Sequence, residues 1–323
     1  MGRSLILLAM AGLLTGAAAP KVRLVEPSYT LIPGSVPMAR GPDGNSIFLD
    51  APKGLILVDT GRHPEHAEKL LAYARSRGKP IAAIVNTHWH LDHTTGNYDV
   101  RTAYPKAQVY ATSAIEGALK GFLQRGREQS DKMMADPKTP AGVKAQLTRA
   151  RHRLDNPDTL RPTVPATKSG KMKIAGRKLD VHVAPFAATE ADLWLFVPNE
   201  GLAIVGDLVV DIVPFMDTAC ADGWQKALAE VAATPFTTLI PGHGAPMNRD
   251  QFSQWRKAFD NFVDCGRSTR LKEECVAGWK RDAAPFIDAA HADYVTEAAG
   301  YYLDTRLRSP PEEQQKYCKR QGV

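Results

Sequence analysis

The sequence predicts an α/β fold, and three observations support this class. A strand, a helix and a second strand alternate between residues 54 and 86. A second set of apolar, strand-like segments follows at 178–183, 192–197 and 203–208. The order of these elements suggests two βαβ-containing halves that face each other.

The N-terminal elements follow from local patterns. Residues 21–60 indicate strands, with turns at Pro33-Gly34 and at 41–44. Between 63 and 77, apolar residues recur at helical spacing, and Gly78 is a plausible C-cap. The apolar run 81–85 predicts a buried strand, and 108–112 predicts the next one.

The remaining chain is expected to be mainly helical outside the second set of strands. Residues 114–160 indicate a helical insertion, broken near residues 136–140 by prolines. A helix is expected around 224–232, and the tail is helical from 250 onward. Two apolar stripes are expected there. The first predicts core packing and consists of Phe252, Trp255, Phe259 and Phe262; the second consists of Tyr294, Ala298, Tyr301 and Tyr302.

The first nineteen residues are typical of a secretory signal. Arg3 precedes a short apolar stretch, and small residues follow, so cleavage is expected after Ala18 or Ala19. The apolar stretch is shorter than the roughly 20 residues that span a bilayer, although a retained anchor is the alternative. We therefore expect a secreted or periplasmic protein with no stable membrane insertion after cleavage.

Four cysteines fit an oxidising compartment. Four cysteines allow three pairings, and the sequence does not choose among them. Our hypothesis is that Cys265 and Cys275 clip a helix–helix turn, while Cys220 and Cys318 tie the tail to the core.

The net charge of +6 is concentrated in one segment. Residues 114–173 hold thirteen Lys and Arg against six Asp and Glu, a local net charge of +7. This excess could attract an anionic substrate or membrane surface, but solvated helix faces explain it better. The segment lacks the interleaved aromatic residues of a single-stranded nucleic-acid platform, so we expect a small-molecule substrate and no nucleic-acid partner.

The strongest functional signal is the segment 87–93, with the sequence THWHLDH. It places three imidazoles and one carboxylate directly after the apolar run 81–85. Imidazole nitrogens and carboxylate oxygens are ligands that zinc prefers. A short buried strand that ends in such a cluster gives the ligands rigid support.

This spacing resembles the metallo-β-lactamase superfamily, and three further segments fit the same pattern. They are GLILVDTG at 54–61, AIVGDL at 203–208 and LIPGHG at 239–244. The resemblance implies an αββα sandwich over residues 20–250, with the insertion beside the active-site mouth and residues 251–323 as a helical extension on the same domain. It also implies two zinc sites whose ligands are His88, His90, Asp92, His93, Asp207 and His243.

One position departs from the family pattern. The segment that should supply a third histidine to the first site carries Ala188. We therefore expect one strongly bound zinc ion at Asp92, His93, Asp207 and His243, and a weak or absent second ion at His88 and His90. Water is the first choice to complete that second site and Glu190 is the other. His182 would need a bend in its strand to reach the site, and the remaining histidines lack supporting spacing: His63, His66, His152 and His291.

The resemblance implies a hydrolase in which metal-bound hydroxide attacks a carbonyl substrate: an ester, thioester, lactone, amide or β-lactam. Asp92 would be a ligand that also orients the nucleophile, and Asp59 would support the histidine loop from behind. Aspartate at position 207 resembles the thioesterase and lactonase branches more than the β-lactamases. The alternative is a periplasmic accessory or binding protein with the same fold and little hydrolytic activity, which Ala188 favours.

Overall fold

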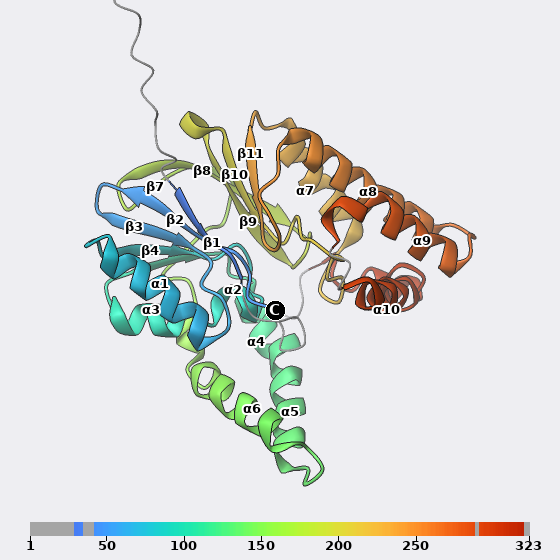
Figure 1. Cartoon of the computed structure of the whole chain (residues 1–323), viewed down its shortest axis with the longest axis horizontal. Coiled ribbons are helices and arrows are strands. Elements are labelled where there is room, and N and C mark those ends of the chain that lie inside the picture. The colour runs from blue at the N-terminus through green and yellow to red at the C-terminus, as the bar shows by residue number, and fades with distance from the viewer. Residues whose placement is uncertain (1–28, 35–41, 288–290, 320–323) are drawn as a thin grey trace, which may run out of the picture.

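The computed structural model describes residues 29–34, 42–287 and 291–319, and two β-sheets pack face to face within them (Figure 1). The first sheet has the order β1-β2-β3-β4-β5-β6. Its strands are β1 (Tyr29–Ile32), β2 (Ser46–Ala51), β3 (Gly54–Val58), β4 (Ile81–Val85), β5 (Gln108–Ala111) and β6 (Val164–Pro165). Strands β1 to β3 pair antiparallel, and β3 to β6 pair parallel.

The second sheet has the order β11-β10-β9-β8-β7. Its strands are β7 (Gly170–Ile174), β8 (Arg177–Pro185), β9 (Ala191–Val197), β10 (Leu202–Gly206) and β11 (Thr238–Pro241). Only β10 and β11 pair parallel; the other neighbours are antiparallel. Both sheets therefore contain parallel neighbours whose carboxyl ends lie at the same edge.

Alternation along the strands explains why the sheets stack. In β2, Ile47 and Leu49 pack in the core between the sheets, whereas Phe48 packs on the outer side of the first sheet. In β3, Ile56 and Val58 face inward in the same way. Because successive side chains of a strand point to opposite faces, apolar residues at every position give two cores, one on each side of the sheet.

Helices cover both outer faces, which confirms the αββα sandwich. The first sheet is covered by α1 (Pro64–Ser76) and α3 (Asn97–Ala103), and the second by α7 (Ala221–Ala233) and α8 (Arg249–Arg267). Figure 1 shows α1 and α3 on the side opposite to α7 and α8. Helix α8 starts with a capping box between Asn248 and Gln251, which satisfies backbone donors at its first turn.

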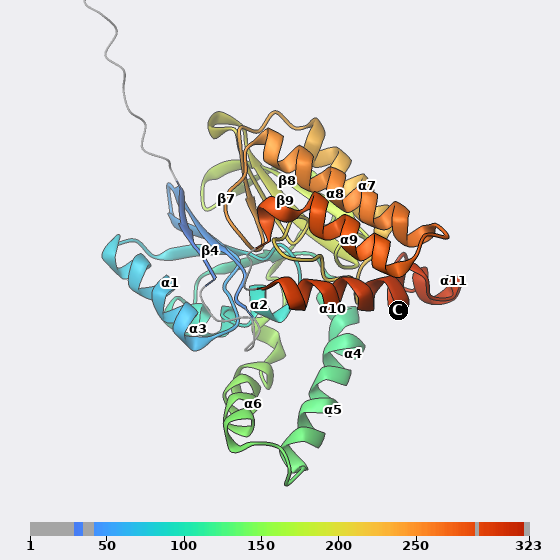
Figure 2. The ribbon, with the colours of Figure 1, turned by 45° about the vertical axis from the view of Figure 1, so that its right-hand side comes forward.

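The helical insertion projects from the body of the molecule (Figures 1 and 2). It consists of α4 (Ile115–Lys120), α5 (Phe122–Ala135) and α6 (Ala141–Leu154), and its break falls between Asp136 and Pro140 as predicted. No side chain of α5 is buried. In α4, by contrast, Ile115 and Ala118 are buried, so the described part of the insertion packs on the body through its base.

The C-terminal extension is helical, as expected, and continues from α8 into α9 (Lys272–Asp282), α10 (Ala292–Tyr302) and α11 (Pro311–Gln314). All four aromatic residues of the first predicted stripe are buried. The second stripe packs only in part, because Tyr302 is buried whereas Tyr294 and Tyr301 are 43% and 49% exposed. One aromatic ring of this stripe therefore lies in the core, and the other two lie at the surface.

The structure contains both disulfides of the hypothesis, one that ties the extension to the core and one within the extension. Cys220 is bonded to Cys318 across 98 residues, and Cys265 is bonded to Cys275 across 10 residues. The predicted signal segment, residues 1–19, lies outside the described residues. Within the described ranges, no helix has the length and apolar character that a membrane span requires.

Candidate metal centre

The residues that the sequence predicts as ligands lie at the carboxyl ends of strands from both sheets. His88 and His90 follow β4, and the short helix α2 (Leu91–Thr94) carries Asp92 and His93. Asp207 directly follows β10, and His243 lies two residues beyond β11. Ligands commonly bind at the carboxyl ends of strands in α/β folds, because loops from several strands converge there.

The six side chains form two groups of potential metal ligands. Group one consists of His88, His90 and Asp207, and group two of Asp92, His93 and His243; the donor atoms of each group lie within 4.8 Å of one another. Asp207 also reaches group two, because its Oδ1 is 3.1 Å from His93 Nε2. Its Oδ2 is 3.5 Å from His88 Nε2, so Asp207 lies between the two groups.

Asp59 holds two of these histidines from behind. Its Oδ2 accepts a hydrogen bond of 2.8 Å from His93 Nδ1 and one of 2.7 Å from the Thr87 hydroxyl. That hydroxyl in turn accepts from His88 Nδ1 at 3.0 Å. Because each imidazole uses Nδ1 to donate, its Nε2 lone pair is left for a metal. Asp59 thus positions both groups without belonging to either.

His90 is oriented by a different partner. Its Nε2 lies 2.9 Å from the Thr218 hydroxyl, which donates to the carbonyl of Ala188 at 3.0 Å. The hydroxyl therefore accepts from His90 Nε2, and Nδ1 remains for a metal. The side chain of Ala188 is only 1% exposed, so the position of the missing histidine is enclosed by protein.

Unpaired buried atoms test whether these residues fit a metal. His88 Nε2 and Asp207 Oδ1 are buried, and no described residue offers them a well-oriented hydrogen bond. Leaving such atoms unsatisfied costs about 1–3 kcal/mol each. Two glycines also make room for the donors, since an added Cβ would lie 2.0 Å from Asp207 Oδ1 at Gly242 and 2.2 Å from the His93 ring at Gly44. The donor set fits a divalent metal ion.

The charges of the two groups differ. Burial and the neighbouring His88 lower the pKa of His90 to about 3. Burial would also lower the pKa of His93, but Asp207, Asp59 and Asp92 raise it well above the ordinary value. The pKa of His243 is raised by Asp207 and Asp92 against burial. Group two therefore carries protons at a pH where His90 is neutral.

The other predicted positions have structural roles. Glu190 belongs to neither group of described ligands. His182 stacks on Trp194, with ring centroids 3.7 Å apart, and His66 pairs with the buried Ser46 hydroxyl at 2.8 Å. His63 contacts Asp43 at 3.1 Å. Each of these three histidines contacts a neighbour outside the two groups of potential ligands.

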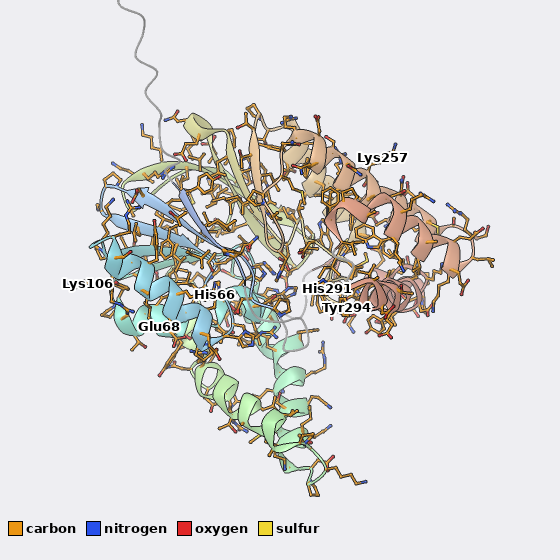
Figure 3. The ribbon with its side chains drawn as sticks, in the orientation of Figure 1. His66, Glu68, Lys106, Lys257, His291 and Tyr294 are labelled. Atoms are coloured by element: carbon orange, nitrogen blue, oxygen red, sulfur yellow. A yellow bond between two sulfur atoms is a disulfide. The ribbon has the colours of Figure 1, made fainter. Side chains whose placement is uncertain are left out.

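Some residues of the site were not predicted. Thr218 and Arg62 carry no recognisable spacing, although Thr218 contacts His90, and the guanidinium Nη2 of Arg62 is 3.7 Å from Asp92 Oδ1. His291 lines the cavity of the site instead of lying on an unrelated surface. Figure 3 shows His291 and Tyr294 near each other at the start of α10, toward the centre of the molecule.

The segment after Asp207 is fastened by helices that follow it in the chain. Three buried indole N–H groups donate to alternate carbonyls of this segment. The pairs are Trp224 of α7 to Leu208 at 3.0 Å, Trp255 of α8 to Val210 at 2.7 Å and Trp279 of α9 to Ile212 at 3.0 Å. Arg306 donates to the next bound carbonyl, that of Met216, at 3.0 Å. Residues 208–216, which we call the fastened segment, are thereby held in one conformation.

The metal centre opens into a cavity of about 590 Å³. His90, Asp92, Asp207 and His243 lie in its wall together with apolar side chains of the insertion and the fastened segment. This volume is within the usual range of about 300–1,000 Å³ for small-molecule sites. The arrangement suits binding of a small molecule beside the metal ligands.

Curated relatives are hydrolases. The chain is 26% identical over 226 residues to a linear primary-alkylsulfatase from Pseudomonas sp. (strain ATCC 19151), covering 62% of this chain and 41% of that protein. It is 40% identical over 58 residues to a hydroxyacylglutathione hydrolase from Synechococcus sp. (strain JA-3-3Ab), covering 18% and 23%. The chain thus spans less than half the length of these relatives.

Solved structures and a family profile agree on the fold. A double mutant of the sec-alkyl sulfatase PisA1 has a TM-score of 0.61 at 18% identity, covering 86% of this chain and 49% of that one. A metallo-beta-lactamase family protein from Thermus thermophilus has a TM-score of 0.58 at 17% identity, covering 86% and 94%. Residues 39–243 match the family described as the metallo-beta-lactamase superfamily. The chain therefore belongs to the metallo-beta-lactamase superfamily.

Proposed function

We propose that the protein is an exported, zinc-dependent hydrolase that cleaves a small-molecule ester, thioester, lactone or amide. The observation that carries this proposal is the convergence of six potential ligands, with His88 Nε2 and Asp207 Oδ1 buried and without a well-oriented hydrogen bond from the described residues. Zinc is the metal that such nitrogen and oxygen donors suit. When bound, zinc lowers the pKa of water to about 7 and so supplies hydroxide at neutral pH.

The residues of the site are assigned three roles: binding the metal, orienting the nucleophile and excluding bulk water. Asp92, His93, Asp207 and His243 are assigned to one strongly held ion, and His88 and His90 to a weaker one that shares Asp207. Asp92 is also assigned to orient the nucleophile, since its carboxylate faces the cavity between His243 Nε2 at 3.2 Å and Arg62 at 3.7 Å. The apolar side chains of the cavity keep bulk water from the reacting bond.

Export is supported by covalent structure as well as by the signal-like segment. Both disulfides join residues of the C-terminal extension, one of them to Cys220 at the start of α7. Disulfides persist in oxidising compartments and are rare in reducing ones. We therefore propose a secreted or periplasmic location.

A second substrate class is favoured by one comparison. The alkylsulfatase relative aligns over 226 residues, far more than the 58 residues of the hydroxyacylglutathione hydrolase relative. A sulfate ester is therefore the second candidate for the bond that is cleaved. The potential metal ligands do not by themselves distinguish attack on a sulfate sulfur from attack on a carbonyl carbon. Substrate assays must make that distinction.

The test measures metal content and turnover on the same preparation. The full chain is loaded with zinc, dialysed and assayed with nitrocefin, a lactone, a thioester, an alkyl ester and an alkyl sulfate. We expect about one zinc ion per chain to survive dialysis, and hydrolysis of at least one substrate that a chelator abolishes and zinc restores.

Three results would contradict parts of this proposal. Two tightly held zinc ions per chain would defeat the single strong site. Turnover that survives complete metal removal would defeat zinc dependence. A fully metal-loaded chain that cleaves none of the substrates would favour the accessory or binding protein instead.

A further inference from the structure

The cavity beside the potential metal ligands is lined by both polar and apolar side chains. Its polar residues include Arg62, Asp92 and His243, and also Asp211, His291 and Tyr294. Its apolar wall comes from two separate parts of the chain: Phe122 and Leu123 belong to α5, and Val213 and Phe215 belong to the fastened segment. A ligand that reaches the metal ligands must therefore also lie against apolar side chains.

The aromatic rings of the wall extend to the metal ligands themselves. The Phe215 ring centroid is 5.2 Å from that of His90, in an edge-to-face arrangement. Phe122 is 5.6 Å from Trp89 and 6.4 Å from Phe215 between ring centroids. Because aromatic surface begins at a ligand ring, a group bonded directly to the reacting atom would contact it first.

One side of the wall is fixed before any ligand binds. Val213 and Phe215 belong to the fastened segment, whose carbonyls at Ile212 and Met216 accept hydrogen bonds from Trp279 and Arg306. A preformed apolar surface binds an apolar group without paying the ordering cost of a mobile loop. The other side comes from the insertion, where Phe122 and Leu123 start α5 at its contact with the body.

We propose that the substrate carries an alkyl or aryl group bonded directly to the scissile carbonyl or sulfate, and that Phe122, Leu123 and Phe215 select it. This inference rests on the proposed hydrolytic function. It separates the two kinds of substrate that the relatives suggest, because an apolar chain matches this wall and a polar peptide-like conjugate does not. Each buried methylene contributes about 0.8 kcal/mol, which corresponds to about four-fold in binding or rate.

The first experiment is a chain-length series with a small, constant leaving group. The zinc-loaded protein is assayed with S-methyl thioesters of acetic, butanoic, hexanoic and octanoic acids. Water adds its oxygen to the acyl carbon, the C–S bond breaks, and methanethiol leaves with a proton while the carboxylic acid is formed. We expect kcat/KM to rise by up to about four-fold per added methylene until the wall is covered.

Matched variants locate the effect. Leu123→Ala should lower the octanoyl-to-acetyl ratio of kcat/KM by about ten-fold, since it removes part of the wall. Leu123→Trp should also lower that ratio, by filling the cavity. Leu271→Ala is the control, because Leu271 is 66% exposed and lies outside the cavity lining. A ratio that is flat with chain length, or equally changed by Leu271→Ala, would overturn the inference.

A binding measurement decides the inference even if no thioester is cleaved. Calorimetric titration of the full zinc-loaded chain with octanoate and butanoate should show at least ten-fold tighter binding of octanoate, reduced in Leu123→Ala. Equal affinities would refute the apolar selection. Tight octanoate binding without turnover of any thioester would keep the apolar selection and reject the proposed hydrolysis.

Discussion

The two groups of potential ligands each take two residues from the loop 88–93 and one from another strand end, but they differ in completeness. Group two has three donors of its own from two strand ends, and Asp207 Oδ1 lies 3.1 Å from His93. Group one depends on the shared Asp207 for its third donor, and the carbon side chain of Ala188 stands where the family pattern has an imidazole. Within one cluster, group two thus has the donors for tight metal binding, whereas group one leaves a coordination position open.

The support of the two groups differs as well. The Asp59 carboxylate directly holds His93 of group two, but it reaches His88 only through the Thr87 hydroxyl. His90 is held by the neutral hydroxyl of Thr218. A hydrogen bond to a charged group is about twice as strong as a neutral one, so group two is also the more firmly oriented.

Removing one ligand from each group is the most direct way to break this comparison. His243→Ala should lose the tightly held zinc and lower hydrolysis by more than about 100-fold, since even partners of ligands are worth about 10–100-fold. His90→Ala should keep that zinc and lose less activity. Zinc per chain after dialysis and kcat/KM are measured together. If His90→Ala loses the tight zinc as completely, the two groups act as one site.

The supporting residues should show the same difference at smaller scale. Asp59→Asn should weaken tight zinc binding by about 10–100-fold, because it removes the charged partner of His93. Thr218→Val keeps a similar volume and should leave the tight zinc unchanged, while weakening any second ion. Competition against a chelator gives both affinities. Equal losses in the two variants would contradict separate support.

Restoring the missing imidazole should make the groups more alike. Ala188→His offers group one a third histidine, so a second zinc ion should survive dialysis in this variant. The position is enclosed, and overpacking of such sites costs about 1–3 kcal/mol, so stability is followed by urea unfolding. Ala188→Leu is the control for bulk without a donor. A folded Ala188→His chain that still holds one zinc would show that another feature limits group one.

The raised pKa values of His93 and His243 predict a pH dependence that belongs to group two. The neighbouring Asp207 and Asp92 raise the pKa of both histidines against burial, so without metal they hold their protons to a higher pH than an ordinary imidazole, whereas the pKa of His90 is about 3. A bound metal must displace those protons. Tight zinc binding should therefore weaken as the pH falls from about 8 to 6, and zinc binding at about pH 7 should release protons. Calorimetry in two buffers of different ionisation enthalpy measures the release, which should shrink in His243→Ala. Proton-free binding would contradict this assignment.

The fold and the convergence of the six potential ligands could be predicted from the sequence because both depend on local patterns. The apolar run 81–85 and the cluster after it are short segments whose spacing is read directly along the chain. The helix at 63–77 was predicted within one residue of α1 at each end, because its apolar residues recur at helical spacing. The sequence alone left three cysteine pairings open, and the structure confirms the hypothesis that Cys265 pairs with Cys275 and Cys220 with Cys318.

The supporting residues could not be read in the same way. Thr218 lies 128 positions from His90 in the sequence. Its hydroxyl contacts the His90 ring because the chain that follows the fastened segment returns to the site in the folded protein. The three tryptophans that fasten that segment look like ordinary core residues in sequence, because the N–H direction of a buried indole depends on tertiary packing. The position of His291 in the cavity wall has no signal in the sequence, because α10 reaches the cavity through the fold of the extension.

The smallest expected effect concerns the segment that follows the shared Asp207. Trp279→Phe leaves the Ile212 carbonyl without its indole donor and should lower the free energy of unfolding by about 1–3 kcal/mol. Trp194→Phe is the matched control, since its buried indole N–H has no hydrogen-bond partner among the described residues. Because Asp207 serves both groups, loosening this segment should weaken both zinc affinities by similar factors and preserve their ratio. Urea unfolding and chelator competition measure the two quantities, and a loss confined to one group would show that the segment supports that group alone.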